Sequence, residues 1–398
     1  MAVNKIDLNN LDKSDWPTYR FDEIAQNISE RVDPNNTDLE VYIGLEHIDA
    51  ESLHIKRFGT PDDVNGQKLK FYKGDIIFGR RRAYQRKAGI ANCDGFCSAH
   101  ALVLRANPEV IEPKLFPFFL HSNLFMNRAI DISVGSLSPT INWGTLKHQE
   151  FKIPPQIQQR DLANLLWDSD ELLKIKKFTE IKLKMLLDSF KKSSFDYGYG
   201  NYSPELPPGW IMLKVKEFSK VQAGSTPLRS NKQFFDGGTI PWLKTLDLNN
   251  GLIFKTEEKV TDLAIEKTSC KIKPVNTVLV AMYGGYNQIG RTGLLKIPSA
   301  TNQAVSAIEV DEDIINPEYL LHLLNAKIDY WKKVAISSRK DPNITKNDVE
   351  NFPVPIPPRD MQDEIVDSIN LIISTAQDAQ RNVFDFKRLQ SNLIDEVF

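Results

Sequence analysis

The sequence has few cysteines, no long apolar run and almost no excess of charge of either sign. Its three cysteines are too few for the disulfide framework that stabilises many small secreted domains. Apolar segments stay shorter than the about 18 residues that predict a membrane-spanning helix, and the first residues lack the apolar core of a signal peptide. We therefore expect a cytoplasmic protein that does not associate with a membrane.

The formal net charge of −2 excludes a chain that is basic throughout, but it is compatible with locally basic regions. An apolar fraction of 41% is sufficient for buried cores, so extensive disorder is not expected. The length of 398 residues predicts two or three domains.

Enzyme motifs are also missing. The sequence contains no phosphate-binding loop, no Asn-Pro-Pro-aromatic tetrapeptide of the kind found in amino-methyltransferases, and no Pro-Asp…Glu-x-Lys nuclease set. Cys93, Cys97 and His100 are spaced loosely like metal ligands, but structural zinc usually has four ligands and no fourth lies nearby. We interpret these cysteines as buried thiols. The chain is predicted to be non-catalytic and to bind neither metal nor cofactor.

Two long segments without Gly or Pro dominate what is present. Each follows a proline pair, Pro154-Pro155 in one case and Pro357-Pro358 in the other, and a proline pair is typical of a helix start. Helices of roughly 40 residues exceed the usual about 8–20, so we expect the two to pair with each other. The alternative is two surface helices, each packed on its own domain.

The apolar residues of the second helix form a heptad seam, and those of the first form a broader apolar face. The seam comprises Ile365, Ile369, Ile372, Ala376, Ala379, Val383, Phe386, Leu393 and Val397, with Gln390 at one position. The broader face comprises Leu162, Leu165, Leu166, Leu172, Leu173, Ile175, Phe178, Ile181, Met185, Leu186 and Phe190.

Short similarities recur in the same order in both halves, which indicates an internal duplication with a period of about 200 residues. The matched features are Trp16 with Trp210, Gly89 with Gly293, Ile141 and Leu146 with Ile344 and Val349, and the two Ile-Pro-Pro segments. Each half reads as a mixed domain with several strands and a shorter helix late in the domain, near residues 113–129 and 317–333.

The predicted fold class is therefore α+β, with two similar domains, two long helices pairing as an antiparallel coiled coil, and a pseudo-two-fold repeat. The predicted boundaries are a first domain at 1–152, a helix at 153–196, a linker at 197–208, a second domain at 209–355 and a helix at 356–398. A 38-residue helix is about 57 Å long, roughly one and a half turns of duplex DNA. Such a protein would suit a bipartite DNA site.

The most basic loop follows the predicted strand that ends at Phe78. It contains Arg80, Arg81, Arg82, Arg86 and Lys87, together with Tyr84 and Gln85, and no acidic residue. Arginine can neutralise phosphate or bind guanine through two hydrogen bonds, and glutamine can bind adenine in the same way. The alternative is a solvated run of charge whose side chains cover the surface. Five cations without an acid favour DNA contact.

The equivalent loop of the second half has different chemistry, with glycines and amides in place of cations. Its candidate DNA-binding residues are Tyr283, Asn287, Gln288 and Arg291, although an ordinary glycine-rich turn is an equal alternative. Ser225, Thr226 and Arg229 lie in a polar loop that could contact phosphate or be a structural turn. Arg339 and Lys340 are weaker candidates.

Taken together, these features resemble the specificity (S) subunit of Type I restriction–modification enzymes, over nearly the whole chain. The most specific elements are Gly209-Trp210, Gln222-x-Gly224-x-Thr226-Pro227, residues 240–244 and 42–48, residues 74–79, and the two helix starts. The family often has Glu-Gln after its Pro-Pro, whereas this chain has Gln158-Gln159 and Met361-Gln362.

The resemblance implies that each half is a target recognition domain that reads one part of a split DNA sequence. It implies that the helices set the spacing and bind two methyltransferase subunits, with restriction and translocation subunits joining the assembly. S-adenosylmethionine, ATP and Mg²⁺ would then be bound by those partners. Candidate contacts to the methyltransferase subunits are Leu166, Leu173, Phe178, Ile369, Ile372 and Phe386.

Two other functions stay open at this point. One is a coiled-coil adaptor without direct DNA readout. The other is a solitary DNA methyltransferase component, against which the missing cofactor and catalytic motifs count.

Overall fold

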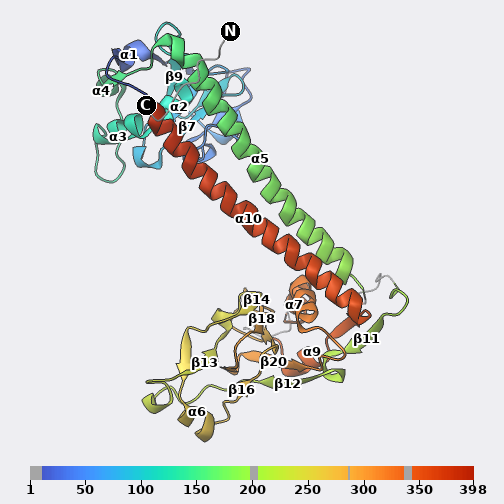
Figure 1. Ribbon diagram of the computed structural model, residues 1–398. Coiled ribbons are helices and arrows are strands. Elements are labelled where there is room, and N and C mark those ends of the chain that lie inside the picture. Colours follow the sequence, from blue (N-terminus) through green and yellow to red (C-terminus); the bar gives the residue numbers. More distant parts are fainter. Residues whose placement is uncertain (1–10, 198–204, 286, 336–342) are drawn as a thin grey trace. The chain divides into compact units, whose positions relative to one another are not determined.

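The chain folds into two compact units (Figure 1). The computed structural model describes residues 11–197, 205–285, 287–335 and 343–398. Unit 1 comprises Met1–Thr179 with Ala379–Phe398, and unit 2 comprises Glu180–Asp378. Each unit therefore holds one mixed domain and one end of each long helix. None of the described helices is both long and apolar enough to span a membrane.

The described part of unit 1 contains two four-stranded sheets and a two-stranded ribbon. The first sheet has the order β2 (Ala25–Ile28), β9 (Ala101–Ala106), β6 (Ile76–Gly79), β7 (Ala88–Ile90), with antiparallel neighbours. The second has the order β3 (Arg31–Val32), β5 (Lys68–Phe71), β8 (Gly95–Cys97), β4 (Tyr42–Ile43), and its β8–β4 pair is parallel. The ribbon pairs β1 (Thr18–Arg20) with β10 (Glu150–Lys152).

Short helices connect and cover these sheets. They are α1 (Phe21–Ile24), η2 (Leu45–His47), η3 (Pro61–Asp63), η4 (Ala83–Gln85), α2 (Phe116–His121), α3 (Asn123–Asp131) and α4 (Trp143–Leu146). The single helix expected near 113–129 is thus two helices, because Ser122 is extended (ψ 151°) and its hydroxyl caps α3 by accepting from Phe125 N–H.

The described part of unit 2 has a similar architecture, with a fifth strand in its first sheet. One sheet has the order β12 (Ser219–Ala223), β20 (Val305–Val310), β17 (Val278–Ala281), β18 (Thr292–Leu295), β14 (Gly251–Ile253). The other has the order β15 (Glu258–Val260), β13 (Ile240–Leu243), β19 (Ser299–Thr301), β16 (Ile272–Lys273). The ribbon pairs β11 (Ile211–Lys214) with β21 (Pro353–Ile356).

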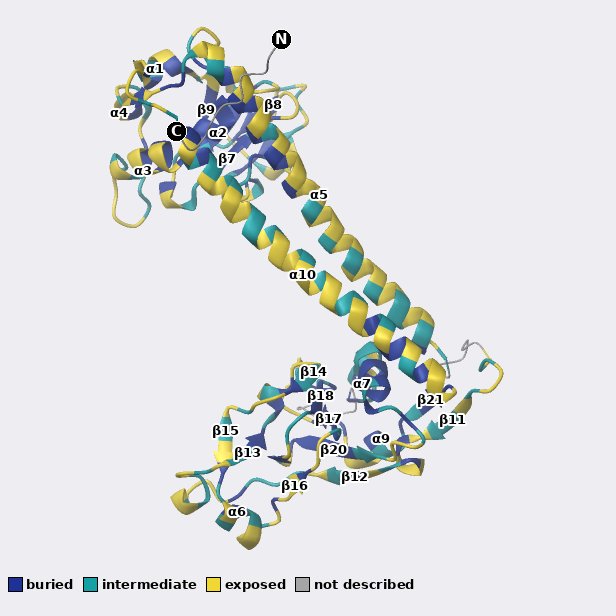
Figure 2. Ribbon diagram, in the orientation of Figure 1, coloured by how far each residue is buried: buried dark blue, intermediate teal, exposed yellow. Residues whose placement is uncertain are grey.

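The short helices of unit 2 are η5 (Val215–Glu217), η6 (Lys232–Phe234), η7 (Thr245–Asp247), α6 (Asp262–Lys267), α7 (Pro317–Ala326), α8 (Ile328–Ala335) and α9 (Lys346–Glu350). The predicted helix near 317–333 is again two helices, α7 and α8. In both units the strands are mainly buried, whereas the middle of each long helix is mainly exposed or half-buried (Figure 2).

The internal duplication is confirmed by the pairing of individual residues. Gly89 on β7 lies opposite Ile77, and Gly293 on β18 lies opposite Leu279. Ile141 N–H donates to the Arg80 carbonyl at 2.9 Å, and Ile344 N–H donates to the Met282 carbonyl at 2.9 Å. The parallel β8–β4 pair recurs as the parallel β19–β13 pair. The two domains therefore share the order of their central strands and differ in the outer strands β3 of unit 1 and β14 and β15 of unit 2.

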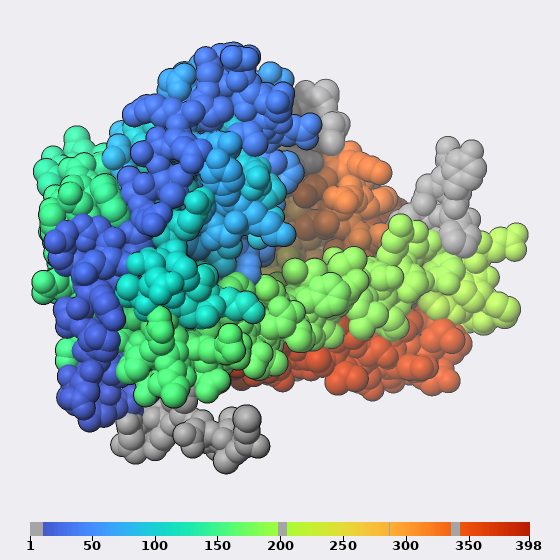
Figure 3. All heavy atoms as spheres, turned by 90° about the horizontal axis from the view of Figure 1, so that it is seen from above, coloured from blue at the N-terminus to red at the C-terminus, as the bar shows by residue number. Residues whose placement is uncertain are grey.

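The two long helices are α5 (Gln156–Phe195) and α10 (Arg359–Val397), which lie side by side (Figure 3). In unit 1 the start of α5 shares a core with the end of α10, through Leu162, Leu166, Ile394 and Val397. In unit 2 the end of α5 shares a core with the start of α10, through residues such as Phe195 and Ile369. The helices are therefore antiparallel, as predicted.

The burial of α10 follows the predicted seam. Ile365, Ile369 and Val397 are buried, and the seam positions between them, including Gln390, are half-buried. Both helices begin after their proline pairs, three residues later than the predicted starts at 153 and 356, because the preceding residues belong to or adjoin β10 and β21. Strand β4 ends at Ile43, because Gly44 caps η2 and its N–H donates to His47 Nδ1.

Candidate nucleic-acid interface

In each unit, the loops that follow two strands lie at one end of a sheet. In unit 2, β12 and β17 both run antiparallel to β20, which lies between them. The last residues of these two strands, Ala223 and Ala281, therefore lie at the same end of the sheet. The two loops leave the sheet about 10 Å apart, two strand spacings. In unit 1, β2 and β6 flank β9 in the same way. This topology brings together segments that are distant in sequence.

The basic loop of unit 1 joins β6 to β7 at this end of the sheet. Arg82 and Arg86 flank η4 with φ of 56° and 49°, the left-handed region that non-glycine residues seldom adopt. The loop holds this conformation through backbone hydrogen bonds: Gly79 N–H donates to the Lys87 carbonyl at 2.8 Å, and Arg82 N–H donates to the Pro139 carbonyl at 2.8 Å. Buried Ala83 anchors its centre.

The five cations of this loop have different roles in the structure. Lys87 Nζ donates to the Leu45 carbonyl at 2.6 Å, and Arg86 donates to the His121 carbonyl at 3.4 Å. Arg80 is half-buried, and its Nε has no hydrogen-bond partner among the described residues. Arg81 and Arg82 are exposed. Arg86 and Lys87 thus brace the loop, while the exposed Arg81 and Arg82 make only long side-chain contacts of 3.5 Å, to His100 and Ser138.

A depression of about 420 Å³ opens beside the exposed arginines. It is lined by Arg81, Arg82, Gln85 and Lys87 from the loop, by Leu45 and Glu46 from η2, and by Ser98 and His100. No carboxylate of a described residue lies within ion-pair distance of the five loop cations. The depression therefore combines unneutralised cations with an amide, a hydroxyl, an imidazole and one carboxylate.

Glu46, Ser98 and His100 were not among the predicted DNA-binding residues. They follow β4 and β8 in the chain, so only the strand order places them beside the basic loop. Residue 98 directly precedes the turn into β9, whose position between β2 and β6 could not be read from periodicity. Tyr84, which was predicted, is 55% exposed beside the same loop.

The cysteines differ from the prediction. Cys97 is buried, and desolvation raises the pKa of its thiol to about 12, as expected for an inert core residue. Cys93 is exposed, so its predicted burial is wrong: it lies in the turn between β7 and β8. Among the described residues, no group of three His, Cys, Asp or Glu side chains is arranged to hold a metal ion.

The equivalent loop of unit 2, between β17 and β18, is neutral apart from Arg291. Its turn is tied to η7, because Gln288 Oε1 accepts from the Thr245 hydroxyl at 3.1 Å. Gly290 is required by packing, since a Cβ there would come within 2.8 Å of the Trp331 ring at a φ of 76°. Tyr283 and Asn287 are exposed, and Arg291 is half-buried. Tyr283, Asn287 and Gln288 remain candidates for base contact.

The polar loop after β12 is held mainly by contacts within the unit. The Ser225 and Ser269 hydroxyls are 2.8 Å apart, and the Thr226 hydroxyl donates to Gln303 Oε1. Arg229 forms an ion pair with Glu258 at 2.5 Å, and its guanidinium carbon lies 4.7 Å from the centre of the Trp242 ring.

These contacts give Arg229 a structural role. The hydrogen bond from Arg229 lowers the pKa of Glu258, with Lys244 contributing in the same direction against desolvation. The proposed DNA contact of Arg229 stays a prediction, as do those of Ser225 and Thr226. Arg339 and Lys340 lie outside the described residues.

Comparison with known proteins places this geometry in a family. The family model described as Type I restriction modification DNA specificity domain matches residues 13–185 and 207–381. The chain belongs to this family. The two matches coincide with the two repeats, and each runs from the start of a mixed domain into a long helix.

Individual relatives are distant in sequence. The specificity subunit of the EcoR124I/EcoR124II restriction enzyme of Escherichia coli is 22% identical over 227 residues, which span 56% of this chain and 56% of that protein. The MjaIX specificity subunit of Methanocaldococcus jannaschii is 23% identical over 285 residues, 67% of this chain and 64% of that protein. The chain thus spans between about half and two thirds of these relatives.

A solved structure that concerns complex assembly and conformational transition of the type I R-M system contains a chain with the same fold. It superposes with a TM-score of 0.66 over 96% of this chain and 97% of that chain, at 20% identity.

For a member of the Type I specificity family, three of the six residues predicted to contact partner subunits need correction, and the other three stay predictions. Leu166, Leu173 and Ile369 are buried within this chain, at 0%, 6% and 0% exposure, so they offer no surface to another protein. Ile372 and Phe386 are half-buried seam residues, and Lys176 Nζ lies 5.4 Å from the centre of the Phe386 ring. Phe178 is 59% exposed.

The apolar surface of α5 lies instead at neighbouring positions. Leu172 and Ile175 in unit 1, and Ile181, Met185 and Leu186 in unit 2, are 49–57% exposed. The sequence contained this signal, because the apolar face of the first helix is broader than one seam requires. Leu166 and Leu173, which were chosen from this face, pack inside the chain.

Proposed function

We propose that this chain is the DNA-binding specificity subunit of a Type I restriction–modification complex, with each unit reading one part of a bipartite site. The observation that carries the proposal is the coincidence of two family matches with two units that share the order of their central strands. The loops at equivalent positions differ in chemistry: residues 80–87 carry five cations, and residues 282–291 carry glycines, amides and one cation. Two domains that recognise different DNA sequences need different side chains in these loops.

Arg81 and Arg82 are proposed as the base-reading cations of unit 1. They are exposed, and they border a depression at the sheet end, whereas Arg86 and Lys87 are engaged with backbone carbonyls. An arginine fork matches the O6 and N7 acceptors of guanine in the major groove. Gln85 lines the same depression and supplies the donor and acceptor pair that suits adenine.

We also propose that methyltransferase subunits bind along the exposed apolar positions of α5. Leu172 and Ile175 present apolar side chains to solvent on the helix that the partners would share. Large exposed apolar residues in a row are typical of an interaction surface. S-adenosylmethionine, ATP and Mg²⁺ would be bound by the partner subunits, and restriction subunits would join through the same assembly in the cytoplasm.

The test is a selection of bound duplexes from a random-sequence pool, performed with the chain and the methyltransferase subunits that copurify with it. Two short motifs separated by a fixed gap are the expected result. With Arg81→Ala and Arg82→Ala together, one of the two motifs should lose its base preference while the other stays unchanged. A single contiguous motif, or no enrichment, would refute the bipartite reading.

The two alternatives give different results in simple binding measurements. A coiled-coil adaptor would leave the random pool unenriched although the partners still copurify. A solitary methyltransferase component would bind S-adenosylmethionine in equilibrium dialysis of the isolated chain, whereas the specificity subunit should not.

A further inference from the structure

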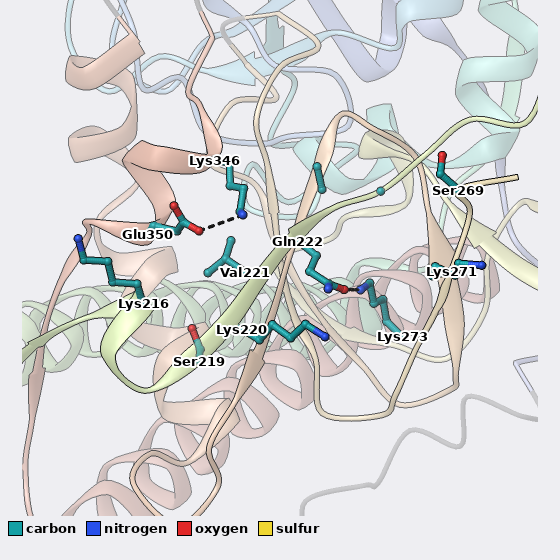
Figure 4. A pocket seen from close by; sticks show the side chains of 12 residues that line it. Lys216, Ser219, Lys220, Val221, Gln222, Ser269, Lys271, Lys273, Lys346 and Glu350 are labelled. Atoms are coloured by element: carbon teal, nitrogen blue, oxygen red, sulfur yellow. Dashed lines mark hydrogen bonds and ion pairs between the residues drawn. The ribbon is translucent and has the colours of Figure 1, made fainter.

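A second basic depression lies in unit 2, outside the loops that the sequence singled out. It has a volume of about 620 Å³ and runs along the edge strand β12 (Figure 4). Figure 4 shows Lys216 and Lys346 with Glu350 on one side of this strand, and Lys271 with Ser269 on the other. Lysine is the commonest residue of its lining, which includes Lys216, Lys220, Lys271, Lys273 and Lys346.

The lysines of this depression are only partly neutralised. Lys273 is buried and pairs with Glu309 at 3.0 Å, and Lys346 pairs with Glu350 at 3.1 Å. Lys216 donates to the neutral Asn351 amide oxygen at 2.9 Å. Lys220 and Lys271 form no ion pair with a described carboxylate. The depression therefore carries a net positive charge, although the whole chain has a formal charge of −2.

The fold does not require Lys216 or Lys220, because unit 1 forms an equivalent scaffold with other residues at these two positions. Val215 N–H donates to the Phe352 carbonyl, and Phe21 N–H donates in the same way to the Gln149 carbonyl. Val215 is therefore equivalent to Phe21, and the next residue, Lys216, is equivalent to Asp22. Lys220 lies opposite Glu309 on β20, and Gln26 lies opposite Arg105 at the equivalent position of β9, so Lys220 is equivalent to Gln26.

Protection of an exposed strand edge is the simplest alternative, since lysine on an edge strand discourages pairing with other chains. The equivalent strand β2 is also an edge strand, yet its sequence Ala-Gln-Asn-Ile contains no lysine. An edge in this scaffold is therefore tolerated without lysine. Something specific to unit 2 accounts for the cluster.

The depression is continuous with the loop end of the sheet. Ala223 and Gly224 line it, and Ser269, which also lines it, contacts the Ser225 hydroxyl at 2.8 Å. From there it extends along β12 to α9. The recognition loop of unit 2 has only Arg291 as a cation, whereas that of unit 1 has five cations. Unit 2 thus places its positive charge beside its loops and not in them.

We infer that this lysine-lined depression binds the phosphate backbone of the DNA duplex whose bases the neighbouring loops of unit 2 contact. The inference rests on the proposed function and assigns the backbone grip to a surface outside the reading loops. Lysine is suited to it, because a compact ammonium neutralises phosphate without the planar fork that base readout uses. In unit 1 the arginines of one loop would serve both purposes.

The experiment measures the salt dependence of duplex binding. The variant is Lys220→Gln with Lys271→Gln, the two lysines that no described carboxylate neutralises. The matched control is Lys232→Gln with Lys255→Gln, which removes the same charge from exposed positions of unit 2 that do not line the depression. Binding of a fluorescein-labelled duplex of mixed sequence is followed by anisotropy between about 50 and 200 mM NaCl.

The expected result is a slope of log affinity against log salt that is less negative by about 0.9 for each lost contact, hence by about 1.8 for the double variant. The control should keep the wild-type slope. A variant slope equal to that of the wild type would overturn the inference while leaving the proposed function intact. If the wild type binds no duplex, the proposed function fails, and this inference fails with it.

A second measurement needs no variant and so does not depend on folding. Acetic anhydride modifies exposed lysines of the wild type, and mass spectrometry compares each lysine with and without the duplex. Lys220 and Lys271 should be protected by DNA, and Lys232 and Lys255 should not. Equal modification of all four in the presence of a saturating duplex would refute the assignment.

Discussion

Gln362, at the start of α10, offers a direct test of how each domain is fixed to its helix. Its side chain is 1% exposed and makes three hydrogen bonds to backbone groups. Oε1 accepts from Asn316 N–H at 2.7 Å, and Nε2 donates to the carbonyls of Ile314 at 3.1 Å and Pro357 at 3.0 Å. One amide thus joins the loop before α7 to the proline pair that precedes the helix.

Replacement by leucine keeps the volume and removes all three hydrogen bonds. A buried polar group left without a partner costs about 1–3 kcal/mol, and carbonyls with a second lone pair lie at the low end. Allowing for the gain from burying an apolar side chain, we expect Gln362→Leu to lower the unfolding free energy by about 3 kcal/mol. Gln362→Glu should cost more, because a carboxylate cannot donate to the two carbonyls.

The assay is urea unfolding, followed by hydrogen exchange of peptides from each unit. With a dependence of about 2 kcal/mol per molar urea, the midpoint of unit 2 should fall by about 1.5 M. The control is Gln377→Leu, an exposed position of the same helix, which should stay within about 0.5 kcal/mol of the wild type. Equal midpoints for Gln362→Leu and the control would refute the reasoning.

Three further predictions follow from the structure. Burial, aided by the nearby Lys191 charge, lowers the pKa of His322 to about 4. The unfolded state therefore binds the proton at a higher pH than the folded state, and the folding stability falls as the pH drops below about 6.5, by about 2 kcal/mol at pH 5. Urea melts of His322→Gln should lack this part of the pH dependence. Leu172→Ser with Ile175→Ser should reduce copurification of methyltransferase subunits without lowering the melting temperature, and a parallel fall in both would contradict a surface role. Gly224→Ala should destabilise unit 2 by about 2 kcal/mol in the same urea assay, because its Cβ would lie 2.2 Å from two backbone oxygens; Gly251→Ala, whose Cβ meets nothing closer than 3.5 Å, is the control.

The organisation of the chain could be predicted from sequence because its signals are local or repeated. Proline pairs and the absence of breakers marked α5 and α10 to within a few residues, and the heptad of α10 marked the face that is buried. The duplication was visible because Gly89 and Gly293 hold the same place in a strand pair.

The candidate site could be predicted only in part, because strand order decides which loops meet. The basic loop at 80–87 was found from composition, but Glu46 and His100 join it only through the positions of β4 and β9 in their sheets. The lysine depression was missed for the same reason: Lys220, Lys271 and Lys346 come from three segments that share no sequence signal.

The role of the helix-start glutamines was equally hidden. Gln159 makes the same set of bonds in unit 1 as Gln362 does in unit 2: its Nε2 donates to the carbonyls of Val110 and Pro154, both at 2.8 Å, and its Oε1 accepts from Glu112 N–H. The sequence showed a glutamine after each proline pair, but two of its three partners lie more than forty residues away in the chain.

Comparison of the two units separates structural charges from those that remain to be explained. Arg105 on β9 and Glu309 on β20 occupy equivalent positions with opposite charge, and each has an opposite partner within its own unit: Asp75 at 2.7 Å and Lys273 at 3.0 Å. The charge at this position is positive in unit 1 and negative in unit 2, but an ion pair is present in both units. We infer that this charge stabilises the fold. Lys220 has gained a charge where Gln26 has none, and Glu309, which lies opposite it across the strand pair, forms its ion pair with Lys273 and not with Lys220. A charge that the scaffold neither needs nor neutralises is the one to test for contact with an external anion, and in a DNA specificity domain that anion is phosphate.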